Sequence, residues 1–503
     1  PMMVLLLAAL AVRLLAVRDL AFPPWVDAVR HALITQVMAT SGQVITSYEP
    51  FLPIENFPYH FGFHTLAASL LMMTGWPLPD LLLYLGQLLN ALIALTVYAA
   101  AWLITRRREA ALGAAFLVAF PFLFPGYYAT WGRFTQLAGM AIMPVLVALT
   151  WMVVRGGRRW QKTWWVVGIL AAGLFLVHLR VFLYYLPLPI LVWLTGWRRG
   201  RCLLAAGALA TLLVVVRAAQ LLPNTESSGL LNAEGAGYNV FPMGYVTAGW
   251  ERLWLALAAV SLLFVLIGWL LKRPWSNFPL MLALWVGGLF LMLAGRVLGL
   301  PESWLVNLNS MYITLFVPLA LLLAIVGERC WRWLSGLKLL RQLFLGIGVT
   351  TLLLFGGRQQ IAILNSQTLL AEPPDRAGLA WVEANLPRDA YVAVSSWQWL
   401  GATLSGSDGG TWLLPLTGRL SSAPPPDYLY DLELASRVTA FNDAASEVSS
   451  WAEPSAAAWL RAQGITHLYV GARGGFLDPA ELARNPDLTL LYQGEGVFVF
   501  EVR

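Results

Sequence analysis

Two neighbouring segments decide how this chain folds: MMVLLLAALAVRLLAV at residues 2–17 and PPWVDAVRH at residues 23–31. The first is apolar except for Arg13 and has the composition of a membrane-spanning helix. The second begins with Pro23-Pro24, which favours a helix start just after it, and it opens a helical stretch that we expect to run to Gly42. The sequence therefore predicts one span followed by a helix outside the membrane.

The composition of the whole chain agrees with a polytopic membrane protein. Of its 503 residues, 58% are apolar and only 12% are charged, and the mean hydropathy is +0.66. Soluble domains carry about 25% charged residues, so an ordinary cytosolic enzyme is excluded. The 24 Trp, 23 Phe and 16 Tyr also exclude a disordered chain.

Apolar runs recur along the first 357 residues. A full span needs about 20 apolar residues, with roughly 17 to 25 as the range. A run at 62–75 is shorter and ends at Gly75-Trp76-Pro77, so we interpret it as a membrane-embedded or re-entrant segment. We expect eleven full spans, at 2–17, 81–105, 110–124, 134–154, 163–178, 181–196, 203–222, 253–271, 277–296, 309–327 and 342–357.

Basic clusters between the spans predict the orientation. Residues 1–357 hold 24 Lys+Arg against 11 Asp+Glu, whereas residues 358–503 hold 9 against 16. Because basic loops favour the cytosolic side, this excess reports orientation and does not indicate nucleic-acid binding. With eleven spans, the outer loop 18–61 and the C-terminal part lie outside the cytosol. We expect an integral protein of the plasma or inner membrane, and the start at Pro1 leaves open further residues ahead of it. The clusters are 106–108, 155–162, 198–201, 272–273 and 329–341.

Residues 358–503 are predicted to form a separate extracytoplasmic α/β domain, and residues 1–357 a transmembrane module. The length of the C-terminal part is that of an ordinary domain, and turns such as Gly494-Glu495-Gly496 separate its elements. We expect helices at 377–386, 396–404 and 454–463, and strands at 391–394, 466–471, 488–493 and 496–502.

Acidic residues outside the membrane are few, which narrows the search for a catalytic group. The sequence has no Walker loop, no dinucleotide-binding glycine motif and no His-Glu-x-x-His. Asp27 and His31 are i and i+4 and share one helix face. We interpret Asp27 as a carboxylate that takes a proton from an acceptor nucleophile, with His31 tuning it or holding a phosphate. The alternative is that Asp27 only caps the helix.

The same outer loop ends in PYHFGFH at residues 58–64, in which His60 and His64 are again i and i+4. Three of the five histidines therefore lie in one loop. A zinc site formed by His31, His60 and His64 is an alternative, although the spacing is generic and no thiolate joins it. Histidine and aromatic side chains are also common at a membrane interface.

Four arginines depart from the expected charge distribution, because Arg133, Arg180, Arg217 and Arg296 fall at or near the outer ends of spans. A charge at membrane depth costs at least about 2.5 kcal/mol on insertion scales, and nearby acids are too few to pair all four. An anionic ligand such as a lipid-linked phosphate would balance them. The alternative is that each arginine extends to the interface without a functional role.

This layout resembles the GT-C glycosyltransferases that use polyprenyl-phosphate sugars as donors. Asp27 matches their catalytic aspartate in the first outer loop, and residues 59–64 resemble the stretch that leads back into the membrane. The segment WGRFTQ at 131–136 resembles the segment that opens a later span in these enzymes. GSDGGTWLLP at 406–415 resembles their extracytoplasmic domains.

The resemblance implies inverting glycosyl transfer, with Asp27 as general base. The arginines would hold the departing lipid phosphate, because fixed cations stabilise the charge that builds there. It further implies that Tyr59, Gln136 and the histidines line the substrate site, and that the C-terminal domain covers the cleft or selects the acceptor. Asp27 lacks a second acid beside it, which disfavours the metal-dependent oligosaccharyltransferase branch unless Glu49 or Glu55 completes a divalent-cation site.

Two other functions are compatible with the sequence. In the first, the chain is a non-catalytic GT-C-like subunit or binding protein of a larger complex, since fold does not imply function. Its C-terminal domain would then bind a protein partner through a surface of Trp397, Trp399 and Trp412. In the second, the chain is a flippase or polymerase for lipid-linked glycans, which the outer arginines allow but the large soluble domain does not explain.

Overall fold

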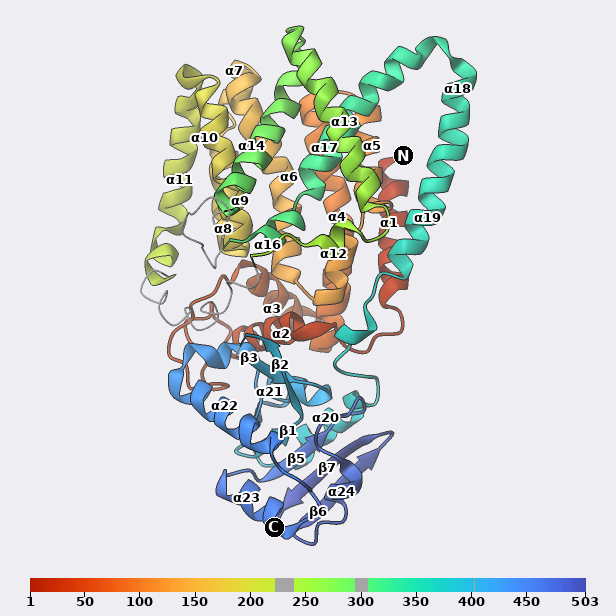
Figure 1. The fold of residues 1–503 in the computed structure, drawn as a ribbon. Coiled ribbons are helices and arrows are strands. Elements are labelled where there is room, and N and C mark those ends of the chain that lie inside the picture. The colour runs from red at the N-terminus through yellow and green to blue at the C-terminus, as the bar shows by residue number, and fades with distance from the viewer. Residues whose placement is uncertain (222–238, 295–305, 402) are drawn as a thin grey trace.

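The computed structural model describes residues 1–221, 239–294, 306–401 and 403–503. They form a bundle of helices with a mixed α/β domain at one end (Figure 1). The polypeptide crosses from the bundle to this domain after α19 (Thr350–Ile361), which extends four residues beyond the predicted boundary at 357.

The predicted apolar runs coincide with helices along most of their lengths. Among the described residues, seven helices are long and apolar enough to cross a membrane, and four more apolar helices are shorter. The count of eleven spans therefore stays a prediction. The main helices of the bundle are α1 (Met2–Val17), α4 (Leu78–Thr105), α5 (Arg108–Ala119), α6 (Phe134–Arg155), α8 (Trp164–Val177), α9 (Leu179–Tyr185), α10 (Pro187–Leu194), α11 (Trp197–Leu221), α13 (Glu251–Leu270), α14 (Asn277–Leu293) and α17 (Phe316–Trp333).

Short helical segments connect or extend these helices, and several lie at the ends of the bundle (Figure 1). The predicted span at 342–357 corresponds to three consecutive helical segments, of which the middle one is a π-helix. The segments are η1 (Gly126–Trp131), α7 (Arg158–Gln161), α12 (Met243–Val246), η5 (Pro274–Ser276), α16 (Leu308–Tyr312), η6 (Leu334–Gly336), α18 (Lys338–Leu343), η7 (Phe344–Val349) and η8 (Ser366–Thr368).

Helix α6 lies in the interior of the bundle, packed against α4, α8 and α11. Its close contact with α4 depends on Gly86, where a Cβ atom would meet Cε1 of Phe134 at 2.4 Å. Inside the same region Arg13 of α1 is 1% exposed, and its Nε donates to Asn90 Oδ1 at 2.9 Å. A buried charge needs such partners, so this arginine holds α1 against α4.

Two helices lie between the bundle and the C-terminal domain: α2 (Trp25–Ser41) and α3 (Gly62–Thr74) (Figure 1). Helix α2 ends at Gly42 as expected, with Gly42 in the left-handed region at φ 66°. Its side chains are buried on most of its faces, including the wholly buried Ala28 and Val29. The short apolar run predicted at 62–75 is the 13-residue helix α3 with its C-cap at Gly75.

The C-terminal domain is built on a five-stranded sheet in the order β4-β1-β5-β7-β6. Strands β4, β1 and β5 are parallel, whereas β7 and β6 are antiparallel to their neighbours. Its strands are β1 (Tyr391–Val394), β4 (Leu420–Ser421), β5 (His467–Val470), β6 (Leu488–Gly494) and β7 (Val497–Val502); its helices are α20 (Asp375–Asn385), η9 (Gly409–Trp412), α21 (Leu413–Thr417), η10 (Pro426–Tyr430), α22 (Leu432–Ser446), α23 (Pro454–Ala462) and α24 (Pro479–Leu482).

The helix predicted at 396–404 is wrong, because this segment belongs to an antiparallel hairpin of β2 (Ser396–Leu400) and β3 (Thr403–Gly406). Trp397 lies opposite Ser405 in this hairpin. Aromatic residues fit a half-buried pleated surface, and Gly401 at φ 56° supplies the positive φ that a tight turn needs. The sequence analysis does not predict helix α22, which packs next to η10.

Contrary to our prediction for a protein partner, Trp412 does not belong to an exposed tryptophan surface. Trp412 is 1% exposed, and its ring lies 5.2 Å from that of Phe22 between the first outer loop and the domain. Trp397 is half-buried and lies 5.2 Å from Trp25 of α2. These two rings thus contribute to the junction with the bundle, because large aromatic side chains gain most from leaving water.

Two arginine–carboxylate contacts join the domain to the rest of the chain. Arg376 of α20 donates to both carboxylate oxygens of Asp80 in α4, with Nη1–Oδ2 at 2.9 Å. Arg30 of α2 donates from Nε to Oδ1 of Asp427 at 2.9 Å, and Asp427 is completely buried. Burial by itself opposes the charge of Arg30, but Asp427 and the nearby tyrosines raise the pKa of Arg30 well above its ordinary value.

We expect Asp427→Ala to lower the thermal unfolding midpoint of the purified protein markedly. Breaking a buried ion pair by removing one partner costs about 3–5 kcal/mol, and Oδ1 of Asp427 also accepts from the Tyr48 hydroxyl at 2.5 Å. The control is Asp487→Ala, since Asp487 pairs with Arg461 at 3.5 Å on the exposed surface. Exposed pairs contribute about 0–1 kcal/mol, so equal effects of the two substitutions would contradict this assignment.

Candidate functional site

Asp27 lies at the junction between the bundle and the domain, in the first turn of α2. Its Oδ2 accepts from Nε of Arg133 at 3.2 Å, and the two side chains are 21% and 18% exposed. Arg133 precedes α6 and follows Gly132, which adopts φ 60°. A Cβ atom on Gly132 would meet Ala28 Cβ at 2.5 Å and Pro24 O at 2.8 Å, so this glycine lets α2 approach closely enough for the ion pair.

A cluster of histidines lies beside this ion pair. His31 Nδ1 and His64 Nε2 are 3.0 Å apart and share a hydrogen bond. The His60 ring lies 3.8 Å from the Tyr59 ring and 4.8 Å from that of His178, measured between centroids. Burial, with His64 and Arg30 nearby, lowers the pKa of His31 well below its ordinary value. Burial and His178 lower the pKa of His60 in the same way, so both rings are neutral near pH 7.

Tyr59 links this cluster to the C-terminal domain. The Arg30 guanidinium lies 3.9 Å from the centroid of the Tyr59 ring, a cation–π contact, and its Nη2 donates to the Tyr430 hydroxyl at 2.5 Å. Burial raises the pKa of Tyr59, so its hydroxyl stays protonated. The domain therefore reaches this cluster through Arg30, which contacts both Tyr430 and Tyr59.

The remaining predicted arginines have different surroundings. Arg180, at the start of α9, donates from Nη1 to Ser310 Oγ at 3.1 Å, and its charge acts on His178 together with that of Arg133. Arg217 is 8% exposed and donates from Nη2 to the carbonyl oxygens of Phe57, at 2.6 Å, and Tyr59. It thus anchors the segment that carries Tyr59. Arg296 lies outside the described residues.

Gln136 lies in the first turn of α6, three residues after Arg133. It is 2% exposed, and its Nε2 has no hydrogen-bond partner among the residues that the structure describes. A buried amide donor without a partner costs about 1–3 kcal/mol, which makes Gln136 a candidate for a polar contact with a ligand.

The residues do not fit a divalent cation. Oδ2 of Asp27 faces the Arg133 cation, and the side chains of Glu49 and Glu55 are exposed in the loop after α2. His31 and His64 bond to each other instead of converging with His60. Within the described ranges, no group of three or more His, Cys, Asp or Glu residues is placed to hold a metal ion.

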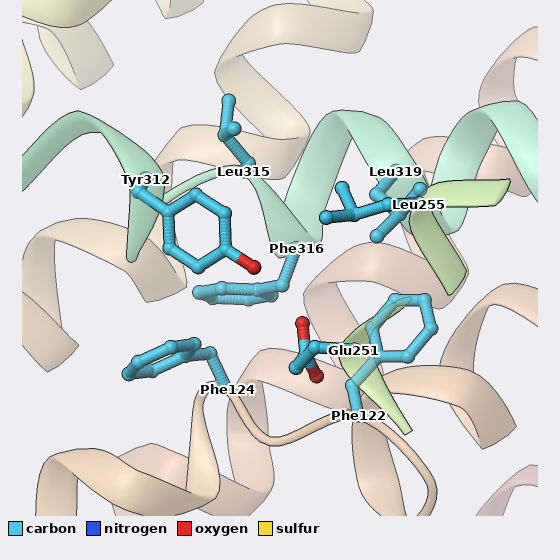
Figure 2. A pocket seen from close by; sticks show the side chains of 8 residues that line it. All are labelled: Phe122, Phe124, Glu251, Leu255, Tyr312, Leu315, Phe316 and Leu319. Atoms are coloured by element: carbon cyan, nitrogen blue, oxygen red, sulfur yellow. The ribbon is translucent and has the colours of Figure 1, made fainter. Parts of the chain in front are cut away.

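A small cavity inside the bundle is separate from this site. Figure 2 shows Glu251 among phenylalanine rings, with the Tyr312 hydroxyl turned toward the same space. The carboxylate accepts from the Leu123 N–H at 3.0 Å, and the cavity volume is about 20 Å³. Such a volume is enough for a water molecule and too small for a sugar or a lipid phosphate.

Comparison with known proteins gives a consistent result for the fold. No protein-family model matches the chain, and no curated protein matches it. Solved structures do match over nearly its whole length. The structure of ArnT from Cupriavidus metallidurans bound to undecaprenyl phosphate has a TM-score of 0.61 at 12% identity, covering 99% of this chain and 97% of that one.

Two further structures share the same architecture. The mycobacterial arabinofuranosyltransferase AftD has a TM-score of 0.61 at 16% identity, covering 100% of this chain and 40% of that one. The Archaeoglobus fulgidus oligosaccharyltransferase has a TM-score of 0.57 at 13% identity, covering 93% and 68%. The chain therefore has the fold of the GT-C glycosyltransferases, as its sequence resemblance implied. At these identities the likeness concerns the fold alone.

Several residues around the site were missed by sequence reasoning. No pattern in the sequence indicates the contact between Arg30 and Asp427, because these residues are 397 positions apart. His178 could have been found, since it precedes Arg180 at a break between two apolar runs. Its Nδ1 accepts from the Val181 N–H at 3.2 Å and so caps α9.

Proposed function

We propose that this protein is a membrane glycosyltransferase that moves a sugar from a polyprenyl-phosphate donor to an extracytoplasmic acceptor with inversion. The observation that carries the proposal is the Asp27–Arg133 ion pair, in which a carboxylate and a cation lie side by side at the N-terminal end of α6. A GT-C fold around this pair supports it.

In the proposed reaction, Asp27 is the general base. It accepts the proton of an acceptor hydroxyl as that oxygen bonds to C1 of the sugar. The bond between C1 and the phosphate oxygen breaks on the opposite side, and polyprenyl phosphate departs with the electron pair. Arg133 and Arg180 would stabilise the charge on that phosphate. Gln136, His60 and His64, which carry buried nitrogens without a partner among the described residues, would donate or accept further hydrogen bonds.

The charge distribution supports an extracytoplasmic site. Helices α7 and α18 belong to the basic segments expected in the cytosol, and they lie at the end of the bundle opposite the C-terminal domain (Figure 1). Under the positive-inside rule, Asp27 and the domain then face the other side of the membrane. A lipid-linked donor in the outer leaflet would reach the site from within the membrane.

The test is turnover of a panel of polyprenyl-phosphate sugars by the full-length protein in detergent or nanodiscs. We expect at least one sugar to be released or transferred, with free polyprenyl phosphate as the second product. The lipid phosphate alone should bind and inhibit. Specific lipid binding without turnover of any donor would favour the non-catalytic subunit instead.

A further inference from the structure

A second cavity lies where α2 meets the C-terminal domain, and nothing above assigns it a role. Its volume is about 520 Å³, within the range of small-ligand sites. It lies between the start of α2, the hairpin β2–β3 and the loop after β5. Its lining residues are Trp25, Gln367, Leu370, Ser396, Trp397, Ser407, Arg473, Gly474 and Gly475.

The lining combines aromatic faces with hydrogen-bonding groups that lack partners. Trp25 and Trp397 meet with their ring centroids 5.2 Å apart at 55°. Trp397 Nε1 and Ser407 Oγ are buried, and neither has a hydrogen-bond partner in the described part of the chain. Among the described residues that line the cavity, Arg473 is the one with a charge. Because orphaned polar atoms are costly when buried, a ligand rich in hydroxyl groups would satisfy them.

The walls of the cavity are held in place by buried carboxylates. Oδ2 of Asp408 accepts from the Gly471 N–H at 2.7 Å, and Oδ1 of Asp375 accepts from the Ala472 N–H at 3.1 Å. These bonds fix the loop that continues into the lining. At Gly475 a Cβ atom would meet Ser395 Cβ at 2.2 Å and Ser407 Oγ at 2.7 Å. Only glycine therefore allows this loop to lie so close to Ser395, between β1 and β2, and to Ser407, just after β3.

The backbone of Trp25 adopts a strained conformation. Its φ of 71° lies in the left-handed region, which is uncommon for a bulky residue and costs about 1–3 kcal/mol. Such strain persists only where the surroundings enforce it, and here the ring of Trp397 packs against Trp25. Trp25 is also two residues from Asp27, so it joins the cavity to the first turn of α2, in which the proposed base lies.

We infer that this cavity binds the acceptor, and that the acceptor is a neutral saccharide chain. Sugar rings offer an apolar C–H face to tryptophan and hydroxyl groups to Trp397 Nε1, Ser407 and Arg473. The described lining has no acidic residue and a single cation, which suits a ligand without net positive charge. The inference rests on the proposed function for the identity of the acceptor, but the binding itself can be measured separately.

The test uses the full-length protein with a panel of neutral oligosaccharides, and binding is followed by saturation-transfer NMR. We expect binding by the wild-type protein and a loss of about tenfold or more in affinity for Trp397→Ala, as for aromatic contacts in the centre of a site. Trp397→Phe, which keeps a ring but removes Nε1–H, should lose less. The control is Trp399→Ala on the same strand, because Trp399 does not line the cavity.

Kinetics separate this inference from the proposed function. In the transferase assay, Trp397→Ala should raise the acceptor KM about tenfold, and the acceptor KM should change more than the donor KM. No saccharide binding, or binding that Trp397→Ala and Trp397→Phe leave unchanged, would overturn the inference even if donor turnover is found. Binding of short peptides in place of saccharides, abolished by Trp397→Ala, would overturn it as well. Saccharide binding that depends on Trp397 without donor turnover would uphold the site and reject the transferase.

Discussion

Asp27→Asn is expected to lower kcat for glycosyl transfer by roughly 10²- to 10⁴-fold, the contribution typical of a general base. Asparagine has nearly the same shape as aspartate, and its amide oxygen can still accept from Arg133 Nε, which now lies 3.2 Å from Oδ2. The substitution removes the basicity while it keeps the geometry. Affinity for polyprenyl phosphate should therefore change little, and the loss should appear in kcat.

A matched ion pair in the same chain provides the control for this prediction. Asp19 pairs with Arg18 at 3.1 Å, just ahead of α2, with side chains 79% and 54% exposed. Asp19→Asn should leave kcat within about twofold of the wild-type value, because exposed pairs contribute little. If Asp27→Asn retains more than a third of the wild-type kcat, Asp27 is not the base. Its role would then be the ion pair with Arg133, because the N-cap of α2 is Pro24 and Asp27 makes no capping hydrogen bond.

Arg133→Gln is expected to lower kcat by roughly 10²- to 10³-fold, comparable to the loss of one donor from a charge-stabilising site. The guanidinium lies against the proposed base, so in the proposed reaction it orients Asp27 and also stabilises the departing phosphate. The second role predicts weaker binding of polyprenyl phosphate as well, which Asp27→Asn should not cause. Equilibrium binding of the lipid phosphate measures this difference directly.

The double variant Asp27→Asn, Arg133→Gln distinguishes the two roles of the arginine. If Arg133 only oriented the base, the double variant would be no slower than Asp27→Asn alone, because the two residues would act as one unit. We expect an additional loss, in agreement with a separate contact to the phosphate. Arg18→Gln serves as the control arginine, since its partner Asp19 is exposed. Unchanged lipid binding in Arg133→Gln would contradict the phosphate contact.

The helical part of the fold followed closely from the sequence. Runs such as 2–17 and 134–154 correspond to α1 and α6 within one residue at each end. This agreement has a local cause: in a membrane, backbone groups must be satisfied within the segment, so an apolar run of sufficient length becomes a helix regardless of its neighbours. The strand at 391–394 was predicted with its correct bounds for a similar reason, because it is short, β-branched and bounded by turns.

Two expectations for the C-terminal domain were wrong. Residues 396–399 alternate polar and aromatic side chains, which is the period of a strand, and in the structure Trp397 packs against Trp25, which is 372 residues away in the chain. Trp412 was expected at the surface and is buried against Phe22, which is also far from it in the chain. Burial of an aromatic side chain is favourable in a core, at a junction between domains or in a complex with a partner. The sequence alone does not distinguish these cases.

The sequence by itself thus determined a chain of apolar helices, an α/β domain at its end and a short list of candidate residues headed by Asp27. Only the tertiary structure decided how those candidates meet. It paired Asp27 with Arg133 across 106 positions, His31 with His64, and Arg30 with Asp427. The physical reason is the range of the interactions: helix formation depends on residues within a turn or two, whereas an ion pair or a shared proton needs atoms within about 3 Å. Close packing at positions such as Gly132 and Ala28 supplies that proximity.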